Sequence, residues 1–165
     1  AQDWMTEQDL IEVNILALTR MCHALGNTMA LQGGGQILNV ASIAAFQPGP
    51  WMSSYYASKA YVLHFSEGLR EELKTCGIKV SVLCPGPTRT AFFGTAQMDI
   101  AKLDRSEQLM SPEELALYTV RALEKNKAII IPGRRNRWLA FSPRFSPRWL
   151  TRKIAGAINK AYCPR

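Results

Sequence analysis

The sequence predicts an α/β fold with a doubly wound parallel sheet. Helical patterns alternate along the chain with short apolar runs, and those runs are continuous rather than alternating. Continuous apolar runs are typical of parallel strands whose two faces are both covered by helices. With 165 residues and 47% hydrophobic composition, the chain is long enough to form one domain with a sizeable core.

The first predicted element is a long helix over residues 6–32. Its apolar residues recur at three- and four-residue steps, the spacing of one helix face: Leu10, Val13, Ala17, Met21 and Leu25. The glycines at 33–35 indicate a helix stop and a turn, because they follow a helix and precede a strand. That strand is predicted over about 36–41.

A second helix is predicted from Ser53 to about Thr75, and Gly77 ends it. The strand "IKVSVL" follows, and Pro-Gly-Pro breaks it sharply. A third helix has strong start signals, because Ser111 and Glu114 form a capping-box pattern. "KAIIIPG" at 127–133 then predicts a last strand.

Residues 1–133 are therefore predicted to form the domain, and residues 134–165 a basic amphipathic tail. The tail holds nine basic and no acidic side chains, so it accounts for the net charge of +7. Aromatic and aliphatic residues lie between its arginines. Three interpretations remain: packing on the body or as a lid, binding to a membrane surface, or binding to nucleic acid. Because no nucleic-acid-binding module is recognisable, we expect no nucleic-acid partner.

Other features limit the classes of protein and site. No run of about 18 apolar residues predicts a spanning helix, and the polar, acidic start does not have the pattern of a signal peptide. We expect no metal site, because the cysteines form no CxxC pair and join no histidine cluster; free thiols suggest a reducing, cytoplasmic location. His23 and His64 are expected to be ordinary helix residues. The cysteines are Cys22, Cys76, Cys84 and Cys163.

Two predicted strands are followed by residues that could take part in a reaction or bind a ligand. Ser42 follows the first strand, and "CPGPTRT" at 84–90 follows the second. The carboxyl ends of parallel strands meet at one sheet edge, where sites form, and the helix with "YYASK" starts there too. A phenol with a pKa of about 10 is a weak acid at pH 7, and a nearby cation lowers that pKa. Lys59 is one helical turn from Tyr55, so the pair predicts a proton donor.

Together, "NVAS" at 39–42, "YYASK" at 55–59 and "CPGPTRT" at 84–90 resemble the short-chain dehydrogenase/reductase family. The thirteen-residue step from Ser42 to Tyr55 and the "EVN" at 12–14 fit the same family. The resemblance covers residues 1 to 133. It implies a Rossmann-like sheet and an NAD(P)-dependent oxidoreductase that interconverts a carbonyl and an alcohol.

The resemblance also implies catalytic roles. Tyr55 would be the general acid/base, and Ser42 would orient the substrate oxygen. Lys59 would hold the nicotinamide ribose and depress the phenol pKa, while Asn14 would keep a water in a proton relay with Lys59. Tyr56 is the alternative donor, because it stands three residues before Lys59. The four-residue step to Lys59 and the register with Ser42 favour Tyr55.

The resemblance further implies a nicotinamide cofactor, with NADP preferred to NAD, a small carbonyl or alcohol substrate, and a homodimer or homotetramer. Tyr55 and Lys59 would contact the cofactor, together with Pro85, Gly86, Thr88 and Thr90. A group of apolar residues flanks the predicted site and forms either a substrate pocket or ordinary loop packing: Phe46, Trp51, Met52, Phe92 and Phe93.

The family's Gly-rich turn, which cradles a pyrophosphate at a helix N-terminus, has no counterpart in the sequence. We therefore expect this chain to be the C-terminal half of the fold, truncated at its N-terminus, and to bind dinucleotide weakly by itself. The alternative is a non-catalytic binding or structural protein, possibly at a membrane surface. The retention of Asn14, Ser42, Tyr55 and Lys59 together favours the enzyme.

Overall fold

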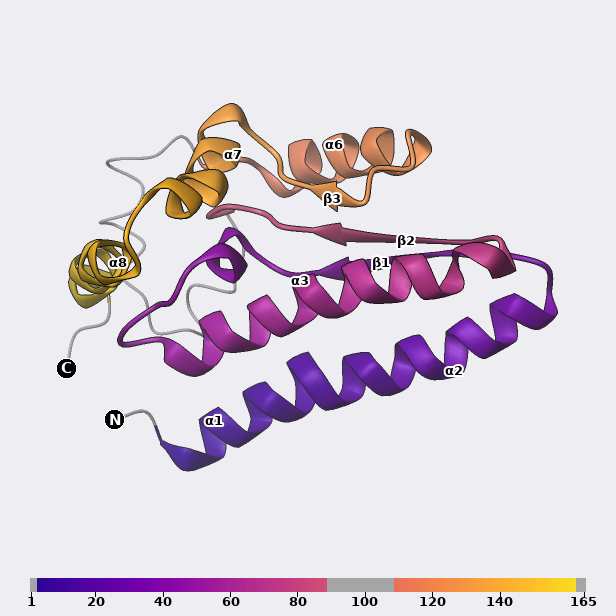
Figure 1. Ribbon diagram of the computed structural model, residues 1–165, viewed down its shortest axis with the longest axis horizontal. Coiled ribbons are helices and arrows are strands. Elements are labelled where there is room, and N and C mark those ends of the chain that lie inside the picture. Colours follow the sequence, from indigo (N-terminus) through magenta and orange to yellow (C-terminus); the bar gives the residue numbers. More distant parts are fainter. Residues whose placement is uncertain (1–2, 89–108, 163–165) are drawn as a thin grey trace.

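The computed structural model describes residues 3–88 and 109–162 (Figure 1). Its sheet has three parallel strands in the order β1-β2-β3: β1 (Gly35–Val40), β2 (Ile78–Leu83) and β3 (Ile129–Ile130). The predicted parallel sheet is confirmed, although β3 is shorter than the apolar run "KAIIIPG". Four residues named above lie outside the described residues: Thr90, Phe92, Phe93 and Cys163.

Helices cover both faces of the sheet, as the fold class requires. One face carries α3 (Ser53–Leu73) and the first helix, which runs from α1 (Trp4–Ile11) through the π-helical turn η1 (Glu12–Ala17) into α2 (Leu18–Leu31) (Figure 1). The other face carries α6 (Pro112–Glu124), where Ala122 packs with Leu83 and Ile130. Two-sided burial explains why the strand sequences are continuously apolar.

The predicted stops and caps have physical causes in the structure. Gly33 and Gly34 have φ values of 84° and 146°, and a Cβ on Gly34 would lie 2.9 Å from the Gly77 carbonyl oxygen. Gly77 has a φ of 72° and follows the short helix η3 (Lys74–Cys76) at the end of α3. Only glycine adopts such backbone without strain. The capping box of α6 is also confirmed, with Ser111 Oγ accepting from the Glu114 backbone N–H.

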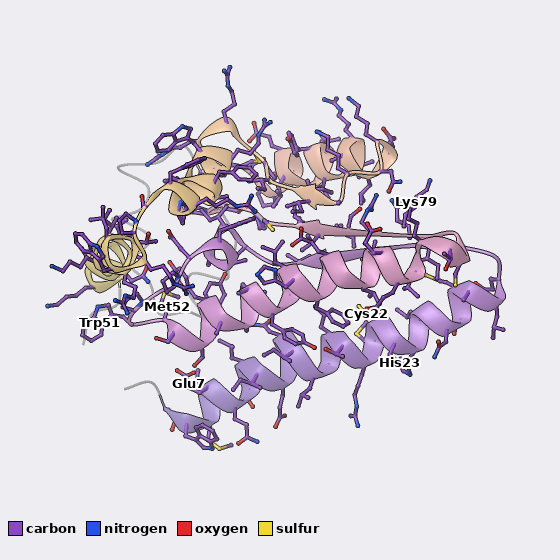
Figure 2. All side chains as sticks on the ribbon, viewed as in Figure 1. Glu7, Cys22, His23, Trp51, Met52 and Lys79 are labelled. Carbon is purple, nitrogen blue, oxygen red and sulfur yellow. The ribbon has the colours of Figure 1, made fainter. Side chains whose placement is uncertain are left out.

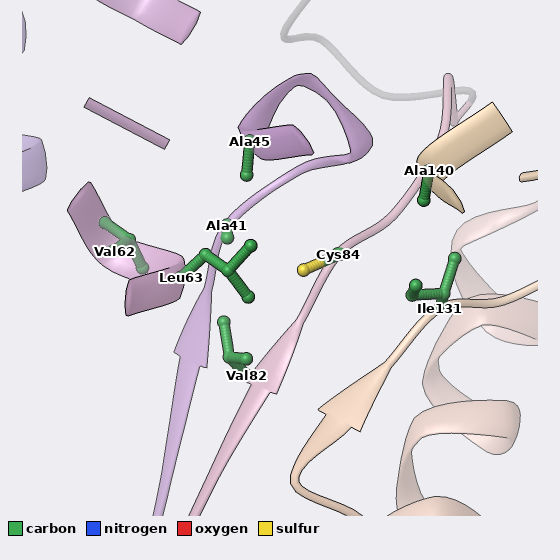
Figure 3. Packing of buried hydrophobic residues seen from close by; sticks show 8 residues of the cluster. All are labelled: Ala41, Ala45, Val62, Leu63, Val82, Cys84, Ile131 and Ala140. Carbon is green, nitrogen blue, oxygen red and sulfur yellow. The ribbon is translucent and has the colours of Figure 1, made fainter. Parts of the chain in front are cut away.

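A core cluster lies under the carboxyl ends of the strands. It joins β2 to α3, to the 3₁₀ turn η2 (Ile43–Phe46) and to α7 (Arg134–Phe141). The buried side chains that form it are labelled in Figure 3: Ala41, Ala45, Val62, Leu63, Val82, Cys84, Ile131 and Ala140. This cluster holds the loops that follow the three strands in a fixed relation to α3.

The first helix does not bury the apolar residues that recur at three- and four-residue steps. Val13, Met21 and Leu25 are 66%, 61% and 46% exposed. Instead Cys22 and Gly26 are buried, and a Cβ on Gly26 would lie 3.3 Å from a methyl carbon of Leu73. Small residues let this face approach α3 closely, whereas periodicity alone does not say which side of a helix is inward. Figure 2 shows Cys22 pointing toward α3 and His23 away from it.

Residues 134–162 form helices that pack on the body of the chain. After α7 come the 3₁₀ turn η4 (Ser142–Phe145) and α8 (Arg148–Tyr162). Four side chains on the inner side of this segment are buried: Ala140, Thr151, Ala155 and Asn159. Within the residues that the structure describes, no helix is long and apolar enough to cross a membrane.

Candidate active site

In the structure, the carboxyl ends of β1 and β2 lie at one edge of the sheet, as predicted. The Ala41 N–H donates to the Leu83 carbonyl at 2.8 Å, and the Ile43 N–H donates to the Pro85 carbonyl at 3.0 Å. These bonds continue the β1–β2 ladder beyond the strands. Ser42 and Pro85 therefore emerge side by side at the carboxyl edge of the sheet, where parallel α/β folds place their sites.

Ser42 is the N-cap of η2 and is held by a hydrogen bond within that turn. Its Oγ accepts a hydrogen bond from the Ala44 N–H at 3.1 Å, so its hydroxyl proton is left to interact with another acceptor. The Tyr55 phenol hydrogen-bonds the Ser42 side chain. Serine and tyrosine, predicted from separate motifs, therefore lie within hydrogen-bond reach of one another.

The pKa of the Tyr55 phenol stands above its ordinary value. Burial raises this pKa most, the hydrogen bond with Ser42 lowers it, and neighbouring Tyr56 raises it further. The expectation that Lys59 depresses the phenol pKa is not met in this structure. The Lys59 ammonium lies 5.8 Å from the centroid of the Tyr55 ring, and burial of the phenol outweighs the opposing effect of the hydrogen bond.

Lys59 is directed toward the sheet edge and the first helix. Its Nζ donates to the Val40 carbonyl at 3.3 Å and to Asn14 Oδ1 at 3.5 Å. Burial lowers the pKa of Lys59, and its electrostatic interaction with Cys84 opposes that shift. An ammonium has three donors, so one N–H remains for a ligand beyond these two acceptors.

Asn14 comes from the π-helical turn η1 and is oriented by a residue that sequence reasoning missed. Its Nδ2 donates to Ser58 Oγ at 3.2 Å, and Ser58 Oγ donates to the Tyr55 carbonyl at 2.8 Å. The bond to Ser58 fixes the amide so that its oxygen faces Lys59. Ser58 is completely buried and stands directly before Lys59 in "YYASK", which is the signal that could have found it.

Tyr56 points to a different neighbour. Its phenol donates to Asn159 Oδ1 of α8 at 3.0 Å, and Asn159 Nδ2 donates to the Pro50 carbonyl at 2.9 Å. Asn159 is 3% exposed, so these bonds are made in a largely dry contact. Tyr56 therefore ties α8 to the loop before α3, a role that no sequence motif indicated.

The residues predicted to meet the nicotinamide end of a cofactor follow β2. Pro85 and Gly86 are half-buried, and Thr88 is buried with its Oγ1 donating to the Gly86 carbonyl at 3.0 Å. A Cβ on Gly86 would lie 2.5 Å from the amide of Asn136. Only glycine allows α7 to approach this loop so closely, and Asn136 was not predicted to contribute.

The predicted apolar pocket is only partly assembled by the described residues. Phe46 lines an open groove of about 670 Å³ between η2, the start of α3 and α8. Met52 is 7% exposed and belongs to the packing of the loop (Figure 2). Trp51 has a φ of 72° and is 45% exposed. Met52 therefore fits the prediction of ordinary loop packing better than the prediction of a substrate pocket.

The buried thiols are not candidates for nucleophilic chemistry. Burial raises the pKa of Cys84 to about 12, so this thiol is neutral at pH 7. Burial also raises the pKa of Cys22, which donates to Asn39 Oδ1. Among the described residues, no group of three or more His, Cys, Asp or Glu side chains could hold a metal ion.

The model of the short chain dehydrogenase family matches residues 2–126. The chain belongs to the short-chain dehydrogenase family. Sulfoacetaldehyde reductase of Chromohalobacter salexigens is 34% identical over 151 residues, which are 85% of this chain and 58% of that protein. The match includes the strand ends and the helix that carry the site described above.

Solved structures agree with this membership. A short-chain dehydrogenase from Sphingobium yanoikuyae in complex with NADPH is 33% identical, with a TM-score of 0.76 over 87% of this chain and 56% of that one. One from Burkholderia cenocepacia in complex with NADP is 27% identical, with a TM-score of 0.74 over 91% of this chain and 60% of that one. The Rossmann-like fold is thus confirmed, and the chain spans little more than half the length of these short-chain dehydrogenases.

Proposed function

We propose that the whole protein is an NAD(P)-dependent oxidoreductase that interconverts a carbonyl and an alcohol. The observation that carries the proposal is the convergence of Ser42, Tyr55, Lys59 and Asn14 at one sheet edge, joined by the contacts described above. A non-catalytic protein would need no phenol, hydroxyl and ammonium held together at this edge. Membership of a dehydrogenase family supports the same proposal.

In the direction of reduction, Tyr55 gives the proton. Its raised pKa keeps the phenol protonated at pH 7, which is the state a proton donor needs. The Ser42 hydroxyl, held by the Ala44 N–H, donates to the same substrate oxygen and fixes it against the phenol. The carbonyl oxygen thereby becomes a hydroxyl and Tyr55 becomes a phenolate. The Lys59 ammonium lies 5.8 Å from the ring centroid, so it favours that negative charge, although burial still sets the direction of the phenol pKa.

Asn14 and Lys59 restore the proton to Tyr55 in this proposal. The Asn14 carbonyl oxygen faces the Lys59 ammonium, and Ser58 prevents the amide from turning around. A water held by Asn14 and Lys59 would carry a proton inward from solvent. In oxidation the same groups act in reverse, and the Tyr55 phenolate is the base.

The residues present fit the nicotinamide end of a cofactor. Lys59 retains one N–H for a ribose hydroxyl, and the chain turns tightly through Pro85 and Gly86 beside Ser42. When bound, the nicotinamide supplies the hydride or accepts it. We propose NADP as the cofactor, supported by the two related structures that contain NADPH or NADP.

The test uses the whole protein with a panel of aldehydes, ketones and secondary alcohols. Loss of nicotinamide absorbance with NADPH, and slower loss with NADH, is the expected result. The matched pair Tyr55→Phe and Tyr61→Phe removes one phenol from the site and one that hydrogen-bonds Thr19 of the first helix, so only the first should abolish turnover. A protein that turns over no member of the panel with either cofactor favours the non-catalytic alternative.

We also propose that the protein is a cytoplasmic homo-oligomer. The exposed stripe of Val13, Met21 and Leu25 supports association, because a second copy would remove these side chains from water. Free thiols at Cys22 and Cys76 suit a reducing compartment. Light scattering of the whole protein should give a dimer or tetramer that Met21→Glu weakens, and a monomeric wild type would contradict this.

A further inference from the structure

The outer side of α7, η4 and α8 carries large apolar side chains, although the segment is already packed on the body. We call this outer side the C-terminal surface. The inner side of α8 buries small or polar residues, Thr151, Ala155 and Asn159. Ile154 and Ile158, which are 52% and 51% exposed, lie on one flank of that inner side. Trp149, which is 55% exposed, lies on the other flank, because nine residues place it about half a turn from Ile158. Burial on the body therefore leaves large apolar side chains uncovered on both flanks of the helix.

On α8 the aliphatic residues form a stripe. Leu150, Ile154 and Ile158 recur every four residues, the spacing of one helix face. Lys153 and Lys160 stand on the adjoining face, between this stripe and Trp149, and the Lys153 ammonium lies 5.7 Å from the centroid of the Trp149 ring. Exposed aliphatic and tryptophan side chains beside lysines are typical of helices that lie in the plane of a membrane interface.

The preceding helix and turn extend the same surface. Trp138 is 75% exposed and Phe145 is 88% exposed. Both line an open groove of about 740 Å³ together with Arg134 and Arg137. The Arg144 guanidinium lies 5.3 Å from the centroid of the Phe141 ring. Aromatic rings and arginines therefore lie together over α7 and η4.

The positive charge of the C-terminal surface indicates which kind of partner it binds. Residues 134–165 contain nine basic and no acidic side chains, so the surface is complementary to an anionic one. Exposed aliphatic residues such as Ile154 would gain little from a nucleic-acid backbone, but they gain from entering the acyl boundary of a bilayer. Tryptophan is also favoured at the level of lipid headgroups. Figure 1 shows α7 and α8 at one end of the molecule, so both helices can meet one surface.

We propose that the C-terminal surface binds the headgroup region of a bilayer that contains anionic phospholipids. The exposed parts of Trp149, Ile154 and Ile158 enter the interface on either side of the α8 lysines, and the lysines and arginines contact lipid phosphates. The binding is peripheral, because α8 stays packed on the body through Thr151, Ala155 and Asn159. This proposal does not depend on the proposed catalytic function.

The experiment is flotation of the whole protein with vesicles of phosphatidylcholine, with and without phosphatidylserine. Binding is expected to the mixed vesicles and to weaken as salt is added. Neutralising two basic residues in Lys153→Gln/Lys160→Gln should lower the partition coefficient by about 30-fold. Trp149→Ser/Ile158→Ser should also lower it. These side chains are exposed, so circular dichroism should show that both variants remain folded.

The matched control is Lys125→Gln/Lys127→Gln, which removes the same charge after α6, on the opposite side of the molecule from α8 (Figure 1). Its partition coefficient should stay close to that of the wild type. The proposal is overturned by absence of binding, by equal binding to neutral vesicles, or by equal losses in the control and the lysine variant. It is also overturned if Trp149→Ser/Ile158→Ser changes the oligomeric state without changing vesicle binding, because the surface then joins two copies of the chain.

Discussion

The side-chain oxygen of Asn14 faces the ammonium of Lys59 at 3.5 Å, although the two residues lie on different helices. Ser58 decides this orientation, since it accepts from the amide nitrogen of Asn14 and donates to the Tyr55 carbonyl. A reversed amide would turn two donors toward the ammonium. The proposed proton relay therefore depends on a serine whose hydroxyl bonds Asn14 and the Tyr55 backbone, not the Tyr55 phenol.

Ser58→Ala should impair catalysis as well as folding. The change removes the acceptor of the Asn14 amide nitrogen, which should lower the free energy of unfolding by about 1–3 kcal/mol. It should also reduce kcat more than it raises KM, because the amide is free to turn. Urea unfolding and steady-state kinetics of the whole protein measure both effects.

Ser66→Ala is the matched control for Ser58→Ala. Ser66 is also buried in α3, accepts from Asn39 and donates to the Val62 carbonyl, but it lies away from Lys59. It should lose similar stability and keep its kcat. Equal falls in kcat for the two variants would mean that Ser58 acts through stability alone.

The contact of Tyr56 with Asn159 should appear as a coupling energy. Tyr56→Phe removes one hydrogen bond and should lower the free energy of unfolding by about 1 kcal/mol. In a double-mutant cycle with Asn159→Ala, the two losses should be less than additive because they share that bond. Strict additivity would show that the bond contributes nothing. Tyr61→Phe is a milder reference, because its partner Thr19 lies on an exposed part of the helix pair.

Gly86→Ala should disturb the loop after β2, because the new methyl would meet Asn136 at 2.5 Å. The Asn136 amide would have to leave the Pro132 carbonyl, to which it donates at 2.8 Å. We expect a higher KM for the nicotinamide cofactor and a small loss of stability. Adding Asn136→Ala removes the clash and should restore much of the KM; a double variant no better than Gly86→Ala would refute the steric explanation.

The titration of Tyr55 gives a pH-dependent prediction. Burial raises its pKa, so the neutral phenol should persist up to pH values above about 10. In protein with ¹³Cζ-labelled tyrosine, the resonance that Tyr55→Phe removes should therefore titrate above the ordinary tyrosine pKa of about 10. Carbonyl reduction should stay constant through neutral pH and fall only at high pH, as the donor loses its proton. A phenol that titrates below pH 9 in the cofactor-free protein would contradict the burial effect.

Sequence patterns predicted the framework and which residues meet at the candidate site. The strand ends, the glycine stop at 33–35 and the capping box at Ser111 follow from local chemistry, so one sequence was enough to find them. The spacing of Tyr55 and Lys59 is likewise a property of a single helix. These features succeed because they depend on neighbours along the chain.

Features that depend on the packing of distant segments were missed. The apolar spacing of the first helix suggested one face, yet Cys22 and Gly26 form the buried one because small residues fit against α3. Nothing local links Tyr56 to Asn159 or Gly86 to Asn136, since each pair joins residues far apart in the sequence. The direction of the Tyr55 pKa shift also needed the structure, because burial raises this pKa more than the hydrogen bond with Ser42 lowers it.

The most direct test compares Tyr55→Phe with Tyr56→Phe in the whole protein, using the carbonyl substrate that the wild type reduces fastest. Both changes remove one hydroxyl from adjacent residues of α3. The rate of hydride transfer, measured by nicotinamide absorbance in a single turnover, should be lost in Tyr55→Phe and kept in Tyr56→Phe. Retention of that rate by Tyr55→Phe, with its loss in Tyr56→Phe, would contradict the account.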